Sequence, residues 1–101
     1  MICYNSIFIL GMITMKLYII HVGYYDYEVG MYELHSQFLI AAKDASTAKN
    51  IVINKSIFKE KKMHIDGIQE INNVEGYKIN LEKTDIQIEN RILSYNEIKE
   101  L

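Results

Sequence analysis

Two histidines and three other polar residues stand at spacings that a β-strand would bring onto one face. The run ELHSQ covers residues 33–37, and a second short motif, HID, covers residues 64–66. Because successive side chains of a strand point to opposite faces, residues two apart share a face. If the two strands are neighbours, we expect the polar residues of both to meet on the face that no helix covers: Glu33, His35, Gln37, His64 and Asp66.

These residue types suit several kinds of site. Two imidazoles and a carboxylate are suitable ligands for zinc or another divalent metal. An aspartate beside a histidine can also orient the ring for general-base work. The same residues would serve a small-molecule or protein partner, or would form a solvated sheet face with its histidines bonded to the backbone. The sequence leaves these alternatives open and assigns no cofactor, metal ligand or catalytic residue.

Three further features are candidates for function. His21 stands in an apolar run, and we expect it to be a core histidine with a backbone partner. A small basic cluster at the end of a predicted helix complements the helix dipole: Lys55, Lys59, Lys61 and Lys62. The third feature is a group of tyrosines that forms either a recognition surface or a cover over the sheet edge: Tyr24, Tyr25, Tyr27 and Tyr32.

Two strands precede the first helix. Residues 16–22 (KLYIIHV) are apolar on both faces, which predicts a central strand that Gly23 ends. Residues 32–42 (YELHSQFLIAA) carry apolar side chains on one face and mostly polar ones on the other. This pattern is typical of an antiparallel sheet that a helix covers on a single side.

A helix and a hairpin are expected next. Asp44 or Ser46 is expected to cap a helix over residues 46–58. Residues 63–81 predict a β-hairpin with a turn ending in Gly76 and a half-buried second strand over residues 77–81. Gly67 predicts a bulge in the first strand of the hairpin, because the isoleucines that flank it do not fit one face of a regular strand.

The predicted fold is therefore α+β: an antiparallel sheet of four to five strands with one main helix on one face, in β-β-α-β-β order. We expect residues 16–101 to form a single domain and residues 1–15 to be an apolar N-terminal extension. Residues 84–87 (TDIQ) have capping-box form, yet Ile86 and Ile88 alternate as in a strand, so residues 84–101 remain either helix or strand.

The chain resembles a bacterial family catalogued as domain of unknown function number 1543, over residues 15–81. The motifs that carry the resemblance are VGY at residues 22–24, Gly30, ELH at residues 33–35 with Phe38, HID at residues 64–66 and VEGYKI at residues 74–79. Family members typically place Asp where Ser36 stands and a second Gly where Tyr24 stands. The resemblance implies no established activity, substrate or cofactor.

We expect a small cytoplasmic binding or interaction module that is not an enzyme. A homodimer through a sheet edge or the apolar N-terminal segment would fit, because this chain has no proline to protect an edge strand. The alternative is a metal-binding protein or hydrolase-like enzyme that uses the paired histidines. A third possibility, a nucleic-acid-associated protein, fits poorly with a net charge of −2. A membrane protein is not expected either, because the longest apolar run is too short for a membrane helix.

Overall fold

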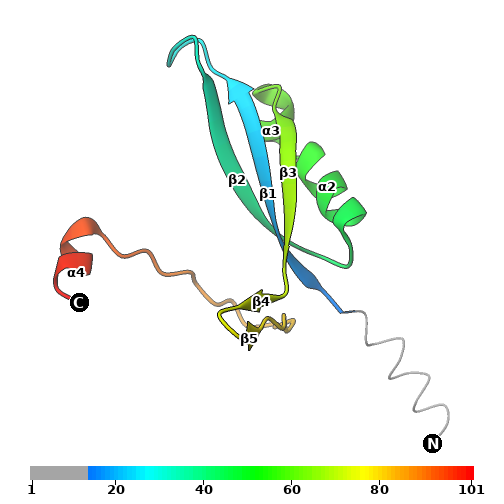
Figure 1. The fold of residues 1–101 in the computed structure, drawn as a ribbon, viewed down its shortest axis with the longest axis vertical. Helices are drawn as coiled ribbons and strands as arrows, with labels where there is room; N and C mark the ends of the chain where they lie inside the picture. The colour runs from blue at the N-terminus through cyan, green and yellow to red at the C-terminus, as the bar shows by residue number, and fades with distance from the viewer. Residues whose placement is uncertain (1–13) are drawn as a thin grey trace, which may run out of the picture.

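A three-stranded antiparallel sheet lies at the centre of the computed structural model, which describes residues 14–101 (Figure 1). Its strands are β1 (Lys16–Tyr25), β2 (Glu33–Ala42) and β3 (His64–Ile71), in the spatial order β2-β1-β3. Residues 1–13, and with them most of the expected N-terminal extension, lie outside the described residues. The prediction of a central first strand is confirmed, since β1 pairs with a strand on each side.

One face of β1 builds the core. Tyr18, Ile20 and Val22 are almost fully buried against the helical layer, and the core continues through Ile40, Ala42, Ala48 and Val52. Gly23 does not end the strand, as the sequence suggested. β1 runs on to Tyr25, so that Gly23 pairs with a residue of each neighbouring strand.

Two helices cover one face of the sheet (Figure 1). Helix α2 (Ala45–Ile53) begins at Asp44, whose side chain accepts a hydrogen bond of 2.8 Å from the backbone N–H of Thr47. Hydrogen bonding from the side chain of Thr47, and next from its backbone N–H, lowers the pKa of Asp44. The expected single helix over residues 46–58 is divided, because Lys55 adopts an extended backbone before the short helix α3 (Ser56–Glu60).

The expected bulge in β3 is confirmed. His21 pairs with Gly67 but its neighbour Val22 pairs with Ile65, which leaves Asp66 as the extra residue on β3. The bulge resets the alternation, so that Ile65 and Ile68 both lie on the helix-covered face. A regular strand would have turned one of them to the opposite face.

The hairpin after β3 is smaller than the sequence predicted. β4 (Asn73–Val74) and β5 (Tyr77–Lys78) pair only with each other, through a turn in which Glu75 and Gly76 both have positive φ. This backbone is typical of a tight hairpin turn. The predicted half-buried strand over residues 77–81 is wrong, since regular pairing stops at Lys78 and Tyr77 is exposed.

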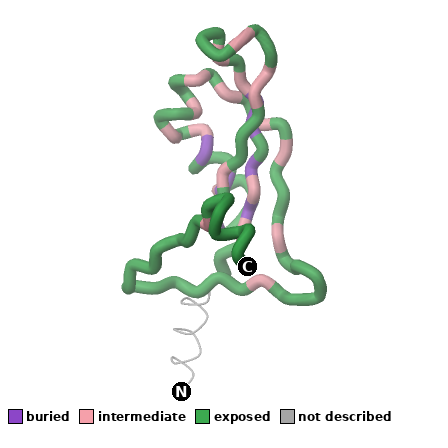
Figure 2. Tube along the Cα trace, turned by 90° about the vertical axis from the view of Figure 1, so that its left-hand side faces the viewer, coloured by how far each residue is buried: buried purple, intermediate pink, exposed green. Residues whose placement is uncertain are grey.

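The C-terminal segment extends away from the domain. Residues 79–94 contain no regular helix or strand, and helix α4 (Tyr95–Lys99) follows with a capping box between Ser94 and Glu97. The helix expected to begin with TDIQ at residues 84–87 therefore starts later and is shorter. Figure 2 shows the segment as exposed along most of its length. The radius of gyration is 18.2 Å, against about 13 Å for a compact domain of this length.

The predicted fold class is confirmed: the chain is α+β, with an antiparallel sheet, one main helix contacting it, and a further small sheet. Over residues 14–101 the five strands are divided between two sheets rather than joined in one. No helix in this part of the chain is long and apolar enough to cross a bilayer.

The core predicts a measurable difference between two neighbouring residues of α2. Val52 is fully buried, whereas Ile51 is exposed. Replacing Val52 with Ala leaves a cavity beneath β1 and should lower the free energy of unfolding by about 2 kcal/mol. Ile51→Ala is the matched control and should cost about 1 kcal/mol or less. Urea denaturation measures both, and equal losses would contradict the described orientation of α2.

Candidate functional site

The uncovered face of the sheet, which we call the open face, changes character along β1. Where β1 begins, the aligned residues are apolar with one exception, Gln69: Leu17 lies between Ala41 and Ile71, and Ile19 lies between Leu39 and Gln69. Where β1 ends, they are polar: His21 between Gln37 and Gly67, then Gly23 between His35 and His64. The open face therefore has an apolar half and a polar half, and the polar half holds the residues that the sequence predicted for a site.

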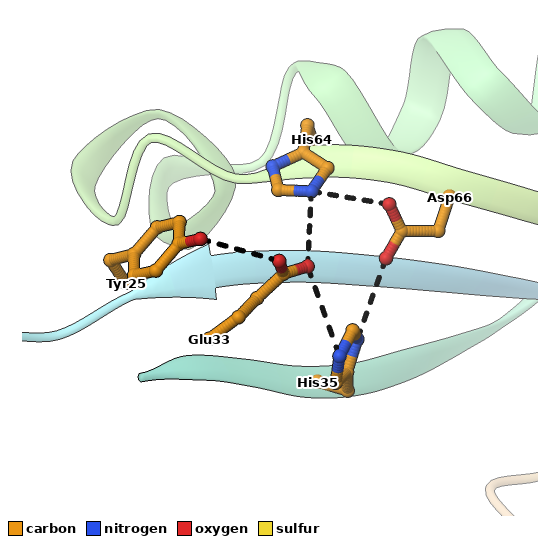
Figure 3. A network of polar contacts seen from close by, with 5 residues as sticks. All are labelled: Tyr25, Glu33, His35, His64 and Asp66. Atoms are coloured by element: carbon orange, nitrogen blue, oxygen red, sulfur yellow. Dashed lines mark hydrogen bonds and ion pairs between the residues drawn. The ribbon is translucent and has the colours of Figure 1, made fainter. Parts of the chain in front are cut away.

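Four side chains of the polar half form a closed ring of alternating acids and bases (Figure 3). We call Glu33, His35, His64 and Asp66 the histidine–carboxylate cluster. His64 Nε2 lies 3.3 Å from Glu33 Oε1 and 3.1 Å from Asp66 Oδ1. On the other side, His35 Nε2 lies 3.8 Å from Glu33 Oε1, and His35 Nδ1 lies 3.4 Å from Asp66 Oδ2. Each imidazole thus contacts both carboxylates.

Gly23 leaves the space into which the cluster converges. A Cβ atom at this position would lie 2.7 Å from His64 Nε2 and 2.8 Å from Asp66 Oδ2, and closer still to Glu33 Oε1. Real Cβ atoms do not approach other atoms so closely, so any other residue would displace these groups. The carboxylates of two edge strands can therefore meet above the central strand only because that strand has no side chain there.

Local features of the edge strands bring the cluster together. The bulge at Asp66 follows His64 by two residues, and both side chains point toward β2 across Gly23. Glu33 begins β2 opposite Tyr25, whose hydroxyl lies 3.5 Å from Glu33 Oε2.

The turn between β1 and β2 is fixed by Asp26. Its carbonyl oxygen accepts hydrogen bonds from the N–H groups of Val29 and Gly30, and its carboxylate accepts one from Glu28. Lys61 Nζ donates to the same carboxylate at 3.0 Å. This bond to Lys61 is the largest cause that lowers the pKa of Asp26. This hydrogen bond joins the turn to the segment that leads into β3. It therefore links the two edge strands that carry the cluster.

The cluster has the dimensions of a metal site. Glu33, His35 and Asp66 each offer one ligand atom, and these atoms lie within 4.8 Å of one another. Ligands at about 2.0–2.2 Å from a tetrahedral zinc ion stand about 3.4 Å apart. The N–O separations within the cluster range from 3.1 to 3.8 Å. The side chains are half-exposed, from 33% for Glu33 to 67% for His35, so an ion could enter from solvent.

Four of the five residues that the sequence proposed for a site are together in the cluster. The fifth, Gln37, lies on the same face but pairs with His21, two residues along β1 from Gly23. His21 is not the core histidine that the sequence suggested. It is exposed on the open face, and its Nε2 lies 3.4 Å from Gln69 Oε1.

Two residues next to the cluster are not predicted from the sequence. The sequence favours a strand that ends at Gly23, and the signal that the strand continues is the pair of aromatic residues between Gly23 and the turn. Tyr25 was grouped with other tyrosines, among which it stacks on Tyr27 at 6.2 Å between ring centroids. Ser36, where the resembled family places Asp, pairs with the buried Val22 and so lies on the helix-covered side. An Asp at that position would not join the cluster.

Comparison with known proteins gives one match. The model of a family described as Domain of Unknown Function (DUF1543) matches residues 30–81, about half of the chain. The match runs from the start of β2 to just beyond β5 and contains all four residues of the histidine–carboxylate cluster. No curated protein and no solved structure matches the chain.

Replacing Gly23 with Ala should disperse the cluster. The added methyl group would occupy the space where the two carboxylates and His64 converge, so the contacts of both imidazoles should change. We expect the ring resonances of His35 and His64 to shift in NMR spectra, while those of His21 remain close to their wild-type positions.

Gly67→Ala is the matched control for this substitution. Gly67 lies on the adjacent strand, and a Cβ there would meet no atom within 4 Å among the described residues. It should leave the three histidine ring signals near their wild-type positions. Equal perturbation of His35 and His64 by the two variants would contradict the convergence over Gly23.

Proposed function

This chain belongs to the DUF1543 family, and we propose that it is a binding module whose histidine–carboxylate cluster holds a divalent transition-metal ion. Zinc is the first candidate, because a mixed set of imidazole and carboxylate ligands suits it. The observation that carries the proposal is the convergence of ligand atoms from two strands over Gly23, the position without a side chain.

The charge and the spacing of the cluster support this proposal. Two carboxylates supply two negative charges, which would balance a divalent cation when both imidazoles are neutral. The separations of 3.8 and 3.4 Å from His35 to the two carboxylates are close to those expected of adjacent ligands around one small ion.

The number of ligands decides which role the metal would have. Four protein ligands would make a closed site, typical of structural zinc. If His64 instead accepts from or donates to a bound water, then Glu33, His35 and Asp66 are the ligands, and a coordination position remains for a water or a substrate.

A second candidate function, metal-dependent hydrolysis, is favoured by the hollow beside the cluster. This hollow has a volume of about 700 Å³ and is lined by the turn between β1 and β2 and by residues 60–62. Tyr25 lines it and its hydroxyl also approaches Glu33, so a molecule held there would contact a residue that borders the cluster. A zinc-bound water is acidic enough to act as a nucleophile near neutral pH. Zinc-dependent cleavage of an activated ester or phosphate ester would distinguish this role from binding alone.

Isothermal titration of untagged protein with zinc tests the proposed site. We expect one ion per chain, with His35→Ala and Asp66→Asn each weakening the affinity by at least about 100-fold, since loss of a ligand should equal or exceed loss of an outer partner. The affinity should fall as the pH is lowered, because protonated imidazoles do not bind metals.

His21→Ala is the matched control for this titration. It removes an exposed histidine from the same face of β1 but outside the cluster. The variant should bind zinc as the wild type does. Failure of the wild-type protein to bind zinc, cobalt or nickel, or an equal loss in the His21 and His35 variants, would refute the proposed site.

A further inference from the structure

The apolar half of the open face is only partly covered among residues 14–101. It consists of Leu17, Ile19, Leu39, Ala41 and Ile71, aligned across the three strands. Leu39, on the edge strand β2 beside Ile19, is 70% exposed. Helices α2 and α3 lie on the other side of the sheet (Figure 1). Contiguous apolar surface of this kind usually marks a contact with another molecule.

The same chain carries an apolar segment that is also uncovered. We call residues 79–101 the arm. Ile86 and Ile88 alternate with polar residues in the sequence before α4, where the chain bends at residues 85–86, and Tyr95, Ile98 and Leu101 recur at three-residue steps in and after α4. All five are more than half exposed, and Ile92 between them is 90% exposed.

An arm of this kind is not expected to hold its form alone. A five-residue helix is far below the length at which isolated helices are stable in water. Fixing the backbone of one residue costs about 1–2 kcal/mol in conformational entropy. The arm buries little apolar surface against its own domain to offset this cost. The observed form of α4, complete with its capping box, is therefore that of a segment that gains its stability from a surface outside its own domain.

The course of the arm favours a second copy of the chain as that surface. Leu81, near the start of the arm, lines an apolar hollow together with Met15 and Ala41, at the end of the apolar half. Beyond this point the arm leads away, and α4 lies apart from the sheet at the far end of an extended run (Figure 1). An arm that leaves its own domain at the edge of this surface is placed to cross to the same surface of a neighbour.

We propose that two copies of the chain exchange arms, so that the arm of each covers the apolar half of the open face of the other. The arrangement is isologous, since each copy gives an arm and receives one. Burial of a large apolar side chain removes about 60–120 Å² from water, and the two arms carry six such residues each. Together with the sheet area beneath them, they reach the roughly 1,200–2,000 Å² of a stable interface.

Sedimentation equilibrium of the full chain, with charged substitutions in the arm and on the face, tests the exchange. The wild-type protein should be a dimer at micromolar concentration. An arm variant, with Ile86→Asp and Ile88→Asp, and a face variant, Leu39→Asp, should each dissociate at least about 10-fold more readily. Gln87→Asp adds a charge at the polar position between the two isoleucines and should leave the dimer intact. All four positions are exposed, so the variants should still fold.

Mixing the arm variant with the face variant distinguishes exchange from other dimers. In the mixture, an intact arm meets an intact face once per pair, so mixed dimers should be tighter than the dimers of either variant alone. A monomeric wild-type protein would overturn the proposal, as would a dimer that neither variant weakens or a mixture without recovery. None of these results bears on metal binding, since the cluster lies on the polar half.

Discussion

The absence of a side chain at Gly23 is the steric constraint on which the candidate site depends. β1 is flanked on both sides, so a residue of this strand would ordinarily fill the space between the side chains of its neighbours. With a glycine there, Glu33 and Asp66 reach over the strand from opposite edges, and both imidazoles contact both carboxylates. A glycine in a strand interior costs about 0.5–1 kcal/mol relative to alanine, and at this position it leaves the space in which the contacts of the cluster form.

The two faces of the sheet have different roles, and the open face is itself divided into a polar half and an apolar half. The helix-covered face takes up the large buried residues, including Ile20 and Val52, and supplies the stability of the domain. The open face places a polar cluster at one end and an apolar surface at the other, along the same strand. We therefore propose metal binding for the polar half of the open face and self-association for its apolar half. Substitutions in either half leave the core unchanged.

The sequence predicts the parts of this structure that follow from alternation. His35 shares a face with Glu33 because they are two residues apart, and the apolar sequence of β1 identifies a central strand. The sequence made the meeting of the polar residues depend on adjacent histidine-bearing strands, whereas β1 lies between β2 and β3 and the residues meet across it over Gly23. The bulge is also foreseeable, because the isoleucines around Gly67 do not fit a regular strand. Alternation does not show what packs against each residue of a strand. For this reason the sequence places His21 in the core, although it lies on the open face.

The failures near the C-terminus have a different cause. Tyr77, Ile79 and Leu81 alternate as in a half-buried strand, and TDIQ at residues 84–87 has the form of a helix start, yet both patterns need a surface on which to pack. Neither segment packs on such a surface, since Tyr77, Ile86 and Ile88 are exposed. Regular pairing stops at Lys78, and the helix is confined to five residues beyond Ser94. Local pattern indicates what a segment can form, and tertiary contact decides whether it does.

Anomalous diffraction at the zinc absorption edge, from crystals of untagged protein grown with zinc, would locate the bound ion. We expect one strong peak above Gly23, with nitrogen and oxygen ligands from His35, Glu33 and Asp66 at about 2.0–2.2 Å. A peak elsewhere on the molecule, or none above Gly23 in fully zinc-equilibrated crystals, would contradict the proposed site.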